Sequence, residues 1–311
     1  DEVITPPITF GATQATLLHL GVTPVFADVD PSTALICPAA VEAAVGPRTT
    51  AIVAVDYAGH PADIDALRAI ADKRKLLLIE DAAHSLGSTY KGRSVGSLAD
   101  ITTLSFFPTK NITSGEGGAV VTRHTEILEK ARRFSRQGLV RERSEFRITT
   151  EGPWHQEVHQ VGLNYRLSDI HAALGLSQLS RLSEFASRRT RIKDLYDASL
   201  SCSQEVCPPV CSPTCEPVWH LYPLRVDPKW RSEIFSQLRA AGIGVQVNYL
   251  PTYRHPALET YARPEEFPGA ESFYAREISL PMHTNLGDEE IALISDLLVD
   301  FLSDLVEVED V

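Results

Sequence analysis

The segment ITTLSFFPTKNITSGEGGAVV, residues 101–121, carries one lysine between two apolar runs. The first run, Ile101–Leu104, has the β-branched composition of a buried strand. A glycine-rich turn, Gly115–Gly118, leads into the second run, which ends at Val121. Lys110 therefore lies on a polar loop whose two ends are held by strands. A lysine in this position is either a solvated loop residue or a nucleophilic amine, and the rest of the chain must decide between the two.

Strand and helix patterns alternate in the part of the chain that precedes this segment. The continuous apolar run Leu76–Ile79 is typical of a strand covered on both faces. Helical spacing over Pro61–Lys75 precedes this run directly. Further back we predict a strand at the start of the chain, a helix and two more strands: Asp1–Ile4, Ala12–Leu20, Pro24–Ala27 and Ala51–Val55. This alternation predicts an α/β domain with a mostly parallel central sheet flanked by helices.

Polar side chains follow two of these strands at their carboxyl ends, where ligands gather in parallel sheets. Asp81 and His84 come directly after Leu76–Ile79, and Ser105 and Lys110 close the next strand. Asp81 alone could be a helix N-cap or a turn former. Together, an acid, a hydroxyl and a lysine are expected to converge on one edge of the sheet.

The second half of the chain indicates a smaller α+β domain. Its expected elements, in order, are helices over Ser168–Leu182 and Glu184–Leu200, a strand over His220–Val226, a helix over Arg231–Ala241, a strand over Val245–Leu250 and a helix over Asp288–Leu305. We expect residues 1–185 to form the large domain and residues 186–311 the small C-terminal one.

Composition excludes several classes of function. The 311 residues carry a net charge of −12, which disfavours nucleic acid as the main partner. No apolar run reaches the roughly 18 residues of a membrane helix, and we expect a cytoplasmic protein. Four cysteines lie in a Pro-rich segment without the spacing of a zinc site, which favours a surface linker over a metal site: Cys202, Cys207, Cys211 and Cys215. No G-x-G-x-x-G follows the first strand, so a nicotinamide-binding domain lacks support.

Pyridoxal 5′-phosphate (PLP) catalysis needs an acid, a hydroxyl and a lysine at the ends of neighbouring strands. The lysine amine forms a Schiff base with the cofactor aldehyde and later shuttles a proton. A carboxylate pairs with the pyridine nitrogen, and hydroxyls and backbone amides hold the phosphate. Lysine suits this role because its pKa falls readily on burial.

Three ordered segments also resemble a known family: DAAHSLG, SFFPTKNITSGEGG and GLNYRLSDIHAALGLSQL, with DEVITPPITF at the start of the chain and GIGVQVNYLP and ISLPMH near its end. They are similar to sugar aminotransferases of the DegT/DnrJ/EryC1/StrS type, which are fold-type I PLP-dependent transferases. Within that family, the segment that begins PWHQEVHQ most resembles the subgroup that aminates C4 of a UDP-linked 4-keto-6-deoxy-N-acetylhexosamine. That reaction forms UDP-4-amino-4,6-dideoxy-N-acetyl-β-L-altrosamine.

The resemblance implies a role for each matching residue. Lys110 matches the Schiff-base lysine, Asp81 the partner of the pyridine nitrogen and Ser105 a phosphate-binding serine. His84 occupies a position beside the cofactor ring, and Phe10 matches an aromatic residue over the cofactor face. For Phe10 ordinary core packing competes with stacking, and His84 could be a satisfied polar residue near a helix cap.

The resemblance also implies partners. Asn164 matches a residue that reaches the cofactor phosphate of the neighbouring subunit, which implies a homodimer with shared active sites. A turn residue at a helix entry is the competing interpretation of Asn164. Arg166 either binds a substrate phosphate or pairs with Asp169. The expected substrates are a nucleotide-linked ketosugar and L-glutamate as amino donor.

Two departures from the family pattern qualify these expectations. Asn248 stands where many relatives have histidine, so any contact made by that histidine is in doubt. The family also has a stretch upstream of DEVITP with a Gly-Thr turn that grips the cofactor phosphate; we expect that stretch to be missing and PLP binding to be weakened. The alternatives are a C3 aminotransferase, an enzyme acting on a GDP- or dTDP-linked sugar, and a non-catalytic truncated or regulatory relative. A dehydratase of the same fold is disfavoured because those proteins carry histidine at the lysine position.

Overall fold

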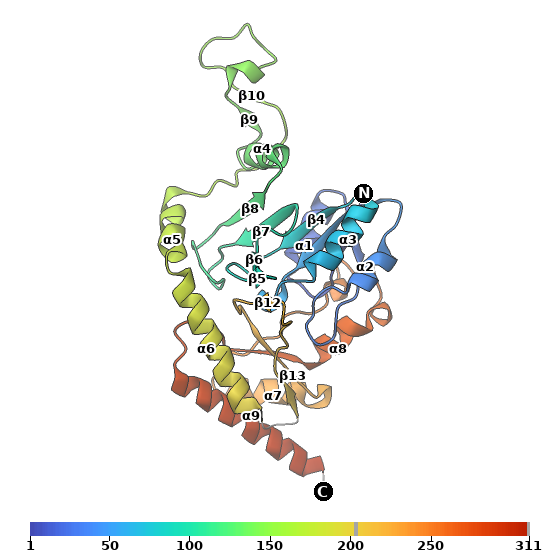
Figure 1. The fold of residues 1–311 in the computed structure, drawn as a ribbon, viewed down its shortest axis with the longest axis vertical. Helices are drawn as coiled ribbons and strands as arrows, with labels where there is room; N and C mark the ends of the chain where they lie inside the picture. Colours follow the sequence, from blue (N-terminus) through green and yellow to red (C-terminus); the bar gives the residue numbers. More distant parts are fainter. Residues whose placement is uncertain (202–204, 310–311) are drawn as a thin grey trace.

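A sheet of six strands forms the centre of the computed structural model, which describes residues 1–201 and 205–309 (Figure 1). Its strands, in spatial order, are β2 (Thr23–Phe26), β1 (Glu2–Thr5), β3 (Thr49–Val55), β4 (Leu77–Asp81), β7 (Ile101–Ser105) and β8 (Gly118–Thr122). Neighbouring strands from β2 to β7 run parallel, and β8 pairs with β7 antiparallel. The prediction of a mostly parallel sheet is confirmed.

Helices and short strands complete the fold. The α-helices are α1 (Ala12–His19), α2 (Pro38–Ala44), α3 (Ile64–Arg74), α4 (Thr125–Phe134), α5 (Asp169–Leu179), α6 (Leu182–Leu200), α7 (Pro228–Ala240), α8 (Pro268–Arg276) and α9 (Asp288–Glu309). The small sheets are β11 (Val206–Cys207) with β13 (Tyr222–Val226) and β14 (Glu277–Leu280); β12 (Cys215–Glu216) with β5 (Thr89–Tyr90) and β6 (Arg93–Ser94); and β9 (Leu139–Val140) with β10 (Glu157–Val158).

Helix α3 illustrates how local signals build the large domain. The carboxylate of Asp63 caps the helix by accepting the backbone N–H of Ala66 at 3.2 Å. Lys75 ends the helix in the left-handed conformation, with φ of 57°. The buried face of α3, which includes Leu67, packs with Leu78 of β4 in one hydrophobic cluster. This packing fixes β4, and with it the residues at its carboxyl end.

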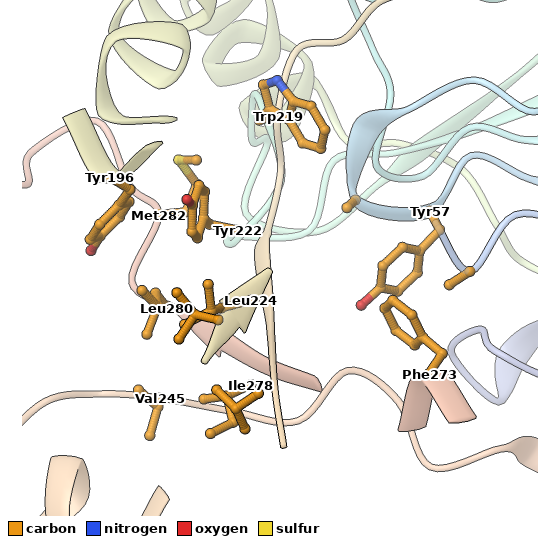
Figure 2. Close-up of a cluster of buried hydrophobic side chains, with 14 of the residues drawn as sticks. Tyr57, Tyr196, Trp219, Tyr222, Leu224, Val245, Phe273, Ile278, Leu280 and Met282 are labelled. Atoms are coloured by element: carbon orange, nitrogen blue, oxygen red, sulfur yellow. The ribbon is translucent and has the colours of Figure 1, made fainter. Parts of the chain in front are cut away.

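Most of the large buried aromatic side chains belong to a second cluster, which is built mainly from the C-terminal part of the chain (Figure 2). Tyr196 of α6 lies against Tyr222 of β13, with ring centroids 4.7 Å apart. Tyr57, which follows β3, packs edge-on against Phe273 of α8. The cluster therefore joins the two halves of the chain. The expected boundary at residue 185 falls within α6, and the division into two domains stays a prediction.

One predicted element is wrong. Residues 245–250 do not form a strand; Gln246 alone makes a bridge, with Ser279. Side chains take up the neighbouring backbone groups instead: the carboxylate of Glu277 accepts the Asn248 N–H at 2.8 Å, and the Tyr57 hydroxyl donates to the Asn248 carbonyl oxygen. The segment is therefore extended without joining a sheet. Helices α2, α4 and α8 were not predicted.

Two elements in the middle of the chain, the β9–β10 hairpin and helix α5, have few contacts with the rest of the molecule. Strands β9 and β10 form a hairpin that projects from the end of the molecule opposite the C terminus (Figure 1). Glu157 holds this arm together by accepting the N–H groups of Arg147 and Ile148 and the Nε2 atoms of His155 and His159. Helix α5 has no buried residue, although most of its side chains are apolar. Such an uncovered apolar face is typical of an interaction surface.

Two adjacent leucines of β4 provide a matched test of the core. Leu78 is fully buried and Leu77 is 43% exposed. We expect Leu78→Ala to lower the free energy of unfolding by about 2–5 kcal/mol, because it leaves a cavity under α3. Leu77→Ala should cost less than about 1 kcal/mol. Urea denaturation followed by circular dichroism measures both, and equal losses would contradict this packing.

Candidate active site

A cavity of about 620 Å³ opens at the carboxyl ends of β4 and β7. Five of the six predicted site residues line it: Phe10, Asp81, His84, Ser105 and Lys110. Asp81 is the last residue of β4 and Ser105 the last of β7. The rule that side chains after parallel strands meet at one edge therefore holds here.

Lys110 has the electrostatic setting of a reactive amine. Burial lowers its pKa from the ordinary lysine value to about 8, while the nearby Asp81 carboxylate acts in the opposite direction. At pH 7 about a tenth of the Lys110 amine is therefore unprotonated, far more than for an ordinary lysine, and only an unprotonated amine is a nucleophile. This setting favours the nucleophilic amine over the solvated loop residue.

Asp81 is held in place from two sides. Thr13 of α1 donates its hydroxyl to Asp81 Oδ2 at 2.9 Å, and the backbone N–H of Ala83 donates to Oδ1 at 3.2 Å. Backbone pairing continues past the strand end, because the Ala82 N–H donates to the carbonyl of Thr103 at 2.9 Å. The carboxylate is thus fixed in the wall of the cavity rather than free to rotate.

His84 is a buried, neutral imidazole. Burial lowers its pKa well below the ordinary value, and the positive charge of Lys110 acts in the same direction. Its Nδ1 accepts the backbone N–H of Ala58 at 3.3 Å, so the proton of the neutral ring lies on Nε2. Nε2 lies 3.2 Å from the hydroxyl of Tyr249. His84 is therefore locked in orientation as well as in protonation state.

The loop after β7 explains the glycines of the GEGG turn. Gly117 has a φ of +149°, and a Cβ atom there would lie 2.6 Å from Ser114 Oγ. A Cβ on Gly118 would lie 2.6 Å from the Leu104 carbonyl oxygen, so only glycine allows β8 to pair this closely with β7. These contacts fold the loop back and keep Lys110 at the rim.

Phe10 presents an aromatic ring, and Ser105 a hydroxyl, on the cavity surface. Phe10 is 65% exposed, so its ring is not part of the core. The described hydrogen bond of the Ser105 hydroxyl is one that it accepts, from the Phe107 N–H at 3.4 Å. Its own proton thus remains available to a bound anion.

A second cavity, of about 870 Å³, lies on another side of Lys110. Thr109, Lys110 and Tyr249 line both cavities. The second cavity extends along residues of α6, β14 and the 243–249 segment. Lys110 therefore stands between an acid-containing cavity and a larger space beside it.

Asn164 is the predicted site residue that does not reach the cavity. It lies near the base of the arm, in a bridge with Arg136, and its Oδ1 accepts Arg166 Nε at 2.9 Å. The described contact of Arg166 is therefore with Asn164 and not with Asp169. Within a single chain Asn164 cannot act on the ligand of this cavity.

Two residues of the cavity were not identified from the sequence. Thr13 orients Asp81, and Tyr249 contacts His84. A signal existed for Tyr249, because it follows Asn248 in a segment that already resembles the family. Thr13 carries no such signal, since its role comes from a contact between residues 68 positions apart.

The residues that line the first cavity fit PLP. They provide an amine with a lowered pKa, a carboxylate held by two hydrogen bonds, a free hydroxyl proton and an exposed aromatic ring. They do not resemble a metal site: no group of three or more His, Cys, Asp or Glu side chains in the described ranges is placed to hold a metal ion. Cys202 lies outside those ranges.

Comparisons with known proteins agree with this chemistry. The model of the DegT/DnrJ/EryC1/StrS aminotransferase family matches residues 1–299. The chain is 38% identical to the spore coat polysaccharide biosynthesis protein SpsC of Bacillus subtilis, over all of this chain and 80% of SpsC. It is 35% identical to the UDP-4-amino-4,6-dideoxy-N-acetyl-β-L-altrosamine transaminase of Helicobacter pylori, over 95% of this chain and 77% of that protein.

Solved structures extend the likeness to the whole fold. PseC of Helicobacter pylori, an aminotransferase of pseudaminic acid biosynthesis, superposes with a TM-score of 0.90 at 34% identity, over 97% of this chain and 80% of PseC. The PLP form of the sugar aminotransferase Spr1654 of Streptococcus pneumoniae gives a TM-score of 0.90 at 30% identity, over 98% of this chain and 81% of that protein. The fold is therefore that of the PLP-dependent aminotransferases, as the sequence predicts. This chain belongs to the DegT/DnrJ/EryC1/StrS aminotransferase family and is a PLP-dependent sugar aminotransferase.

Proposed function

We propose that the chain transfers an amino group from L-glutamate to C4 of a nucleotide-linked 4-keto-6-deoxy-N-acetylhexosamine. The observation that carries the proposal is that Lys110, with a pKa lowered by burial, lines the same cavity as Asp81 on one rim of the sheet. Support for the sugar comes from the name of the Helicobacter pylori transaminase, a 4-amino-4,6-dideoxy sugar nucleotide enzyme. A binding-only relative would need neither a lysine with a lowered pKa nor a fixed acid beside it.

Each residue of the cavity then has a chemical task. Bound PLP supplies an electron sink that stabilises negative charge at the substrate carbon. Lys110 Nζ would take the proton from Cα of the amino donor and, in the second half-reaction, deliver a proton to C4 of the sugar, which its pKa of about 8 allows at neutral pH. Asp81 would keep the ring nitrogen protonated, Ser105 would donate to the phosphate, and Phe10 would cover one face of the ring. His84 would pack beside the ring as a neutral group.

The proposed active form is a homodimer with shared sites. The apolar, uncovered helix α5 and the projecting arm lie next to Asn164 in sequence, and Ile170 of α5 is 83% exposed. A second copy covering this face would bring Asn164 to the cofactor phosphate of its partner. We also propose a cytoplasmic location; none of the helices in the described ranges is long and apolar enough to cross a membrane.

The pH dependence of cofactor capture tests the setting of Lys110. The reactive amine is the unprotonated form, so the rate of PLP capture should rise about tenfold per pH unit below 8 and level off above it. Asp81→Asn removes the charge that raises the Lys110 pKa, so the inflection should move to lower pH. Stopped-flow absorbance of the lysine-bound cofactor measures both. Asp72→Asn, at an exposed acid on α3, should leave the inflection in place, and an inflection near 10.5 in the unaltered chain would contradict the burial of Lys110.

The substrate is tested by following the cofactor spectrum through both half-reactions. L-glutamate should remove the visible absorbance of the lysine-bound cofactor, and one ketosugar nucleotide should restore it. We expect restoration by the UDP-linked 4-keto sugar and not by 3-keto, GDP-linked or dTDP-linked sugars. Lys110→Ala should give neither change. Restoration by a 3-keto sugar alone would replace the C4 assignment.

The dimer is tested by placing a charge on α5. Ile170→Asp should give a monomer in sedimentation velocity and lower turnover at least tenfold, because Asn164 no longer reaches a partner. Val210→Asp introduces the same charge at an exposed valine between β11 and β12, and it should leave both properties unchanged. A fully active monomeric Ile170→Asp chain would overturn the shared site.

A further inference from the structure

Arg189 of α6 is a buried cation that has no acidic partner in the described part of the chain. The residue is 4% exposed, and its Nη1 donates to the carbonyl oxygens of Trp219, His220 and Met282 at 3.0–3.3 Å. Its neighbours on the same helix differ. Arg188 and Arg191 both pair with Asp288, at 2.7 and 2.5 Å. An acid is thus available to α6, but on another side of the helix from Arg189.

The charge on Arg189 is retained despite its burial. Burial lowers its pKa to about 10, which still leaves the guanidinium protonated at neutral pH. Three carbonyl oxygens solvate one of its nitrogens, but they carry no net charge. A buried cation of this kind gains strongly from an anion that enters its surroundings.

Arg189 lines the cavity of about 870 Å³ that adjoins Lys110. The acid on its wall, Glu290, accepts the backbone N–H of Gly287 at 2.7 Å. The other titratable side chains that line this cavity are His220, His283 and Tyr249. Burial and the surrounding positive charges lower the pKa of His220 well below its ordinary value, so it is neutral. Two cations, Arg189 and Lys110, and one acid, Glu290, therefore lie on the wall of this cavity.

Uncharged amide groups complete the wall of this cavity. Gln178, Gln246 and Asn248 line it and can donate or accept hydrogen bonds. A cavity with a buried arginine, several amides and a reactive lysine at one side suits a small ligand with one carboxylate near the arginine and an amine near the lysine. A free cation or an uncharged sugar would leave Arg189 without a counter-charge.

We propose that Arg189 binds a carboxylate of the amino donor, a dicarboxylic amino acid, in the cavity beside Lys110. The inference rests on the proposed transamination and adds a donor site to it. It assigns the first cavity to the cofactor and the second to the donor, with Lys110 between them. The guanidinium acts on the donor by charge and hydrogen bonding and takes no part in proton transfer.

Glutarate is the probe, because it has both carboxylates of L-glutamate and no amine that can react. Calorimetry on the PLP-loaded chain should show glutarate binding, and Arg189→Met should weaken it at least tenfold. Arg191→Met, an exposed arginine of the same helix, should bind glutarate as the unaltered chain does. In turnover, Arg189→Met should raise the KM for L-glutamate at least tenfold, and that for the ketosugar less than threefold. Arg189→Lys should recover part of the glutarate affinity.

A second variant keeps the test decisive if Arg189→Met does not fold. Gln246→Glu places a negative charge on the exposed wall of the cavity and leaves Arg189 intact, so glutarate should bind three- to tenfold more weakly. Unchanged glutarate affinity in folded Arg189→Met or in Gln246→Glu would overturn the proposal. So would loss of UDP binding in Arg189→Met with glutarate binding intact, since the arginine would then serve a phosphate. Glutarate binding without acceptance of any ketosugar would reject the proposed substrate and leave the donor site standing.

Discussion

The register of β4 between β3 and β7 is the constraint on which the rest of the site depends. Asp81 lies opposite Val55 on one side and opposite Thr103 on the other. Backbone bonds continue on both sides, from the Asp56 N–H to the Asp81 carbonyl at 3.1 Å and from the Ala82 N–H to the Thr103 carbonyl. A slip of one residue would turn Asp81 to the other face of the sheet. Because β7 leads directly into the lysine loop, the same register sets the distance at which Asp81 acts on Lys110.

Two further acids are buried close to the rim that carries Asp81. Beneath it, Asp56 and Glu80 are both fully buried, and burial raises the pKa of each. Ser85 donates to Asp56 at 2.6 Å and Thr102 to Glu80 at 2.8 Å, so each acid has a hydroxyl partner. Of the acids at this rim, Asp81 is the one whose charge acts on the pKa of Lys110.

Local signals predicted the elements whose stability comes from their own segment. The apolar run that ends at Ile79 predicted β4, and the caps of α3 lie within or next to the helix itself. Helix α8 was missed because its cap comes from far away: Asp28 accepts the N–H groups of Gly269 and Ala270 at 2.8 and 2.9 Å. Periodicity within residues 268–276 cannot reveal a carboxylate about 240 positions earlier. Helix α4 has the apolar spacing of a helix within its own sequence, so it could have been predicted from local pattern alone.

The same distinction explains the one wrong strand. The alternating pattern of residues 245–250 is typical of a strand, but Glu277 and Tyr57 take up the backbone groups of Asn248 before a partner strand can. Both are distant in sequence, and both are buried side chains whose own polar groups need partners. Packing between the two halves of the chain therefore decided that residues 245–250 bond to these side chains and do not form a strand.

The sequence by itself determined the α/β class, the order of strand ends along the rim, and the placement of Lys110, Asp81 and Ser105 on them. These follow from local patterning and from the way parallel strands end at one edge. Tertiary structure decided that Lys110 is partly desolvated, that Tyr249 contacts His84, and that Arg189 is buried with no acidic partner among the described residues. The reason is physical: the pKa of an amine and the need for a counter-ion depend on the solvent and charges around a group. Those surroundings exist only once distant segments have packed together.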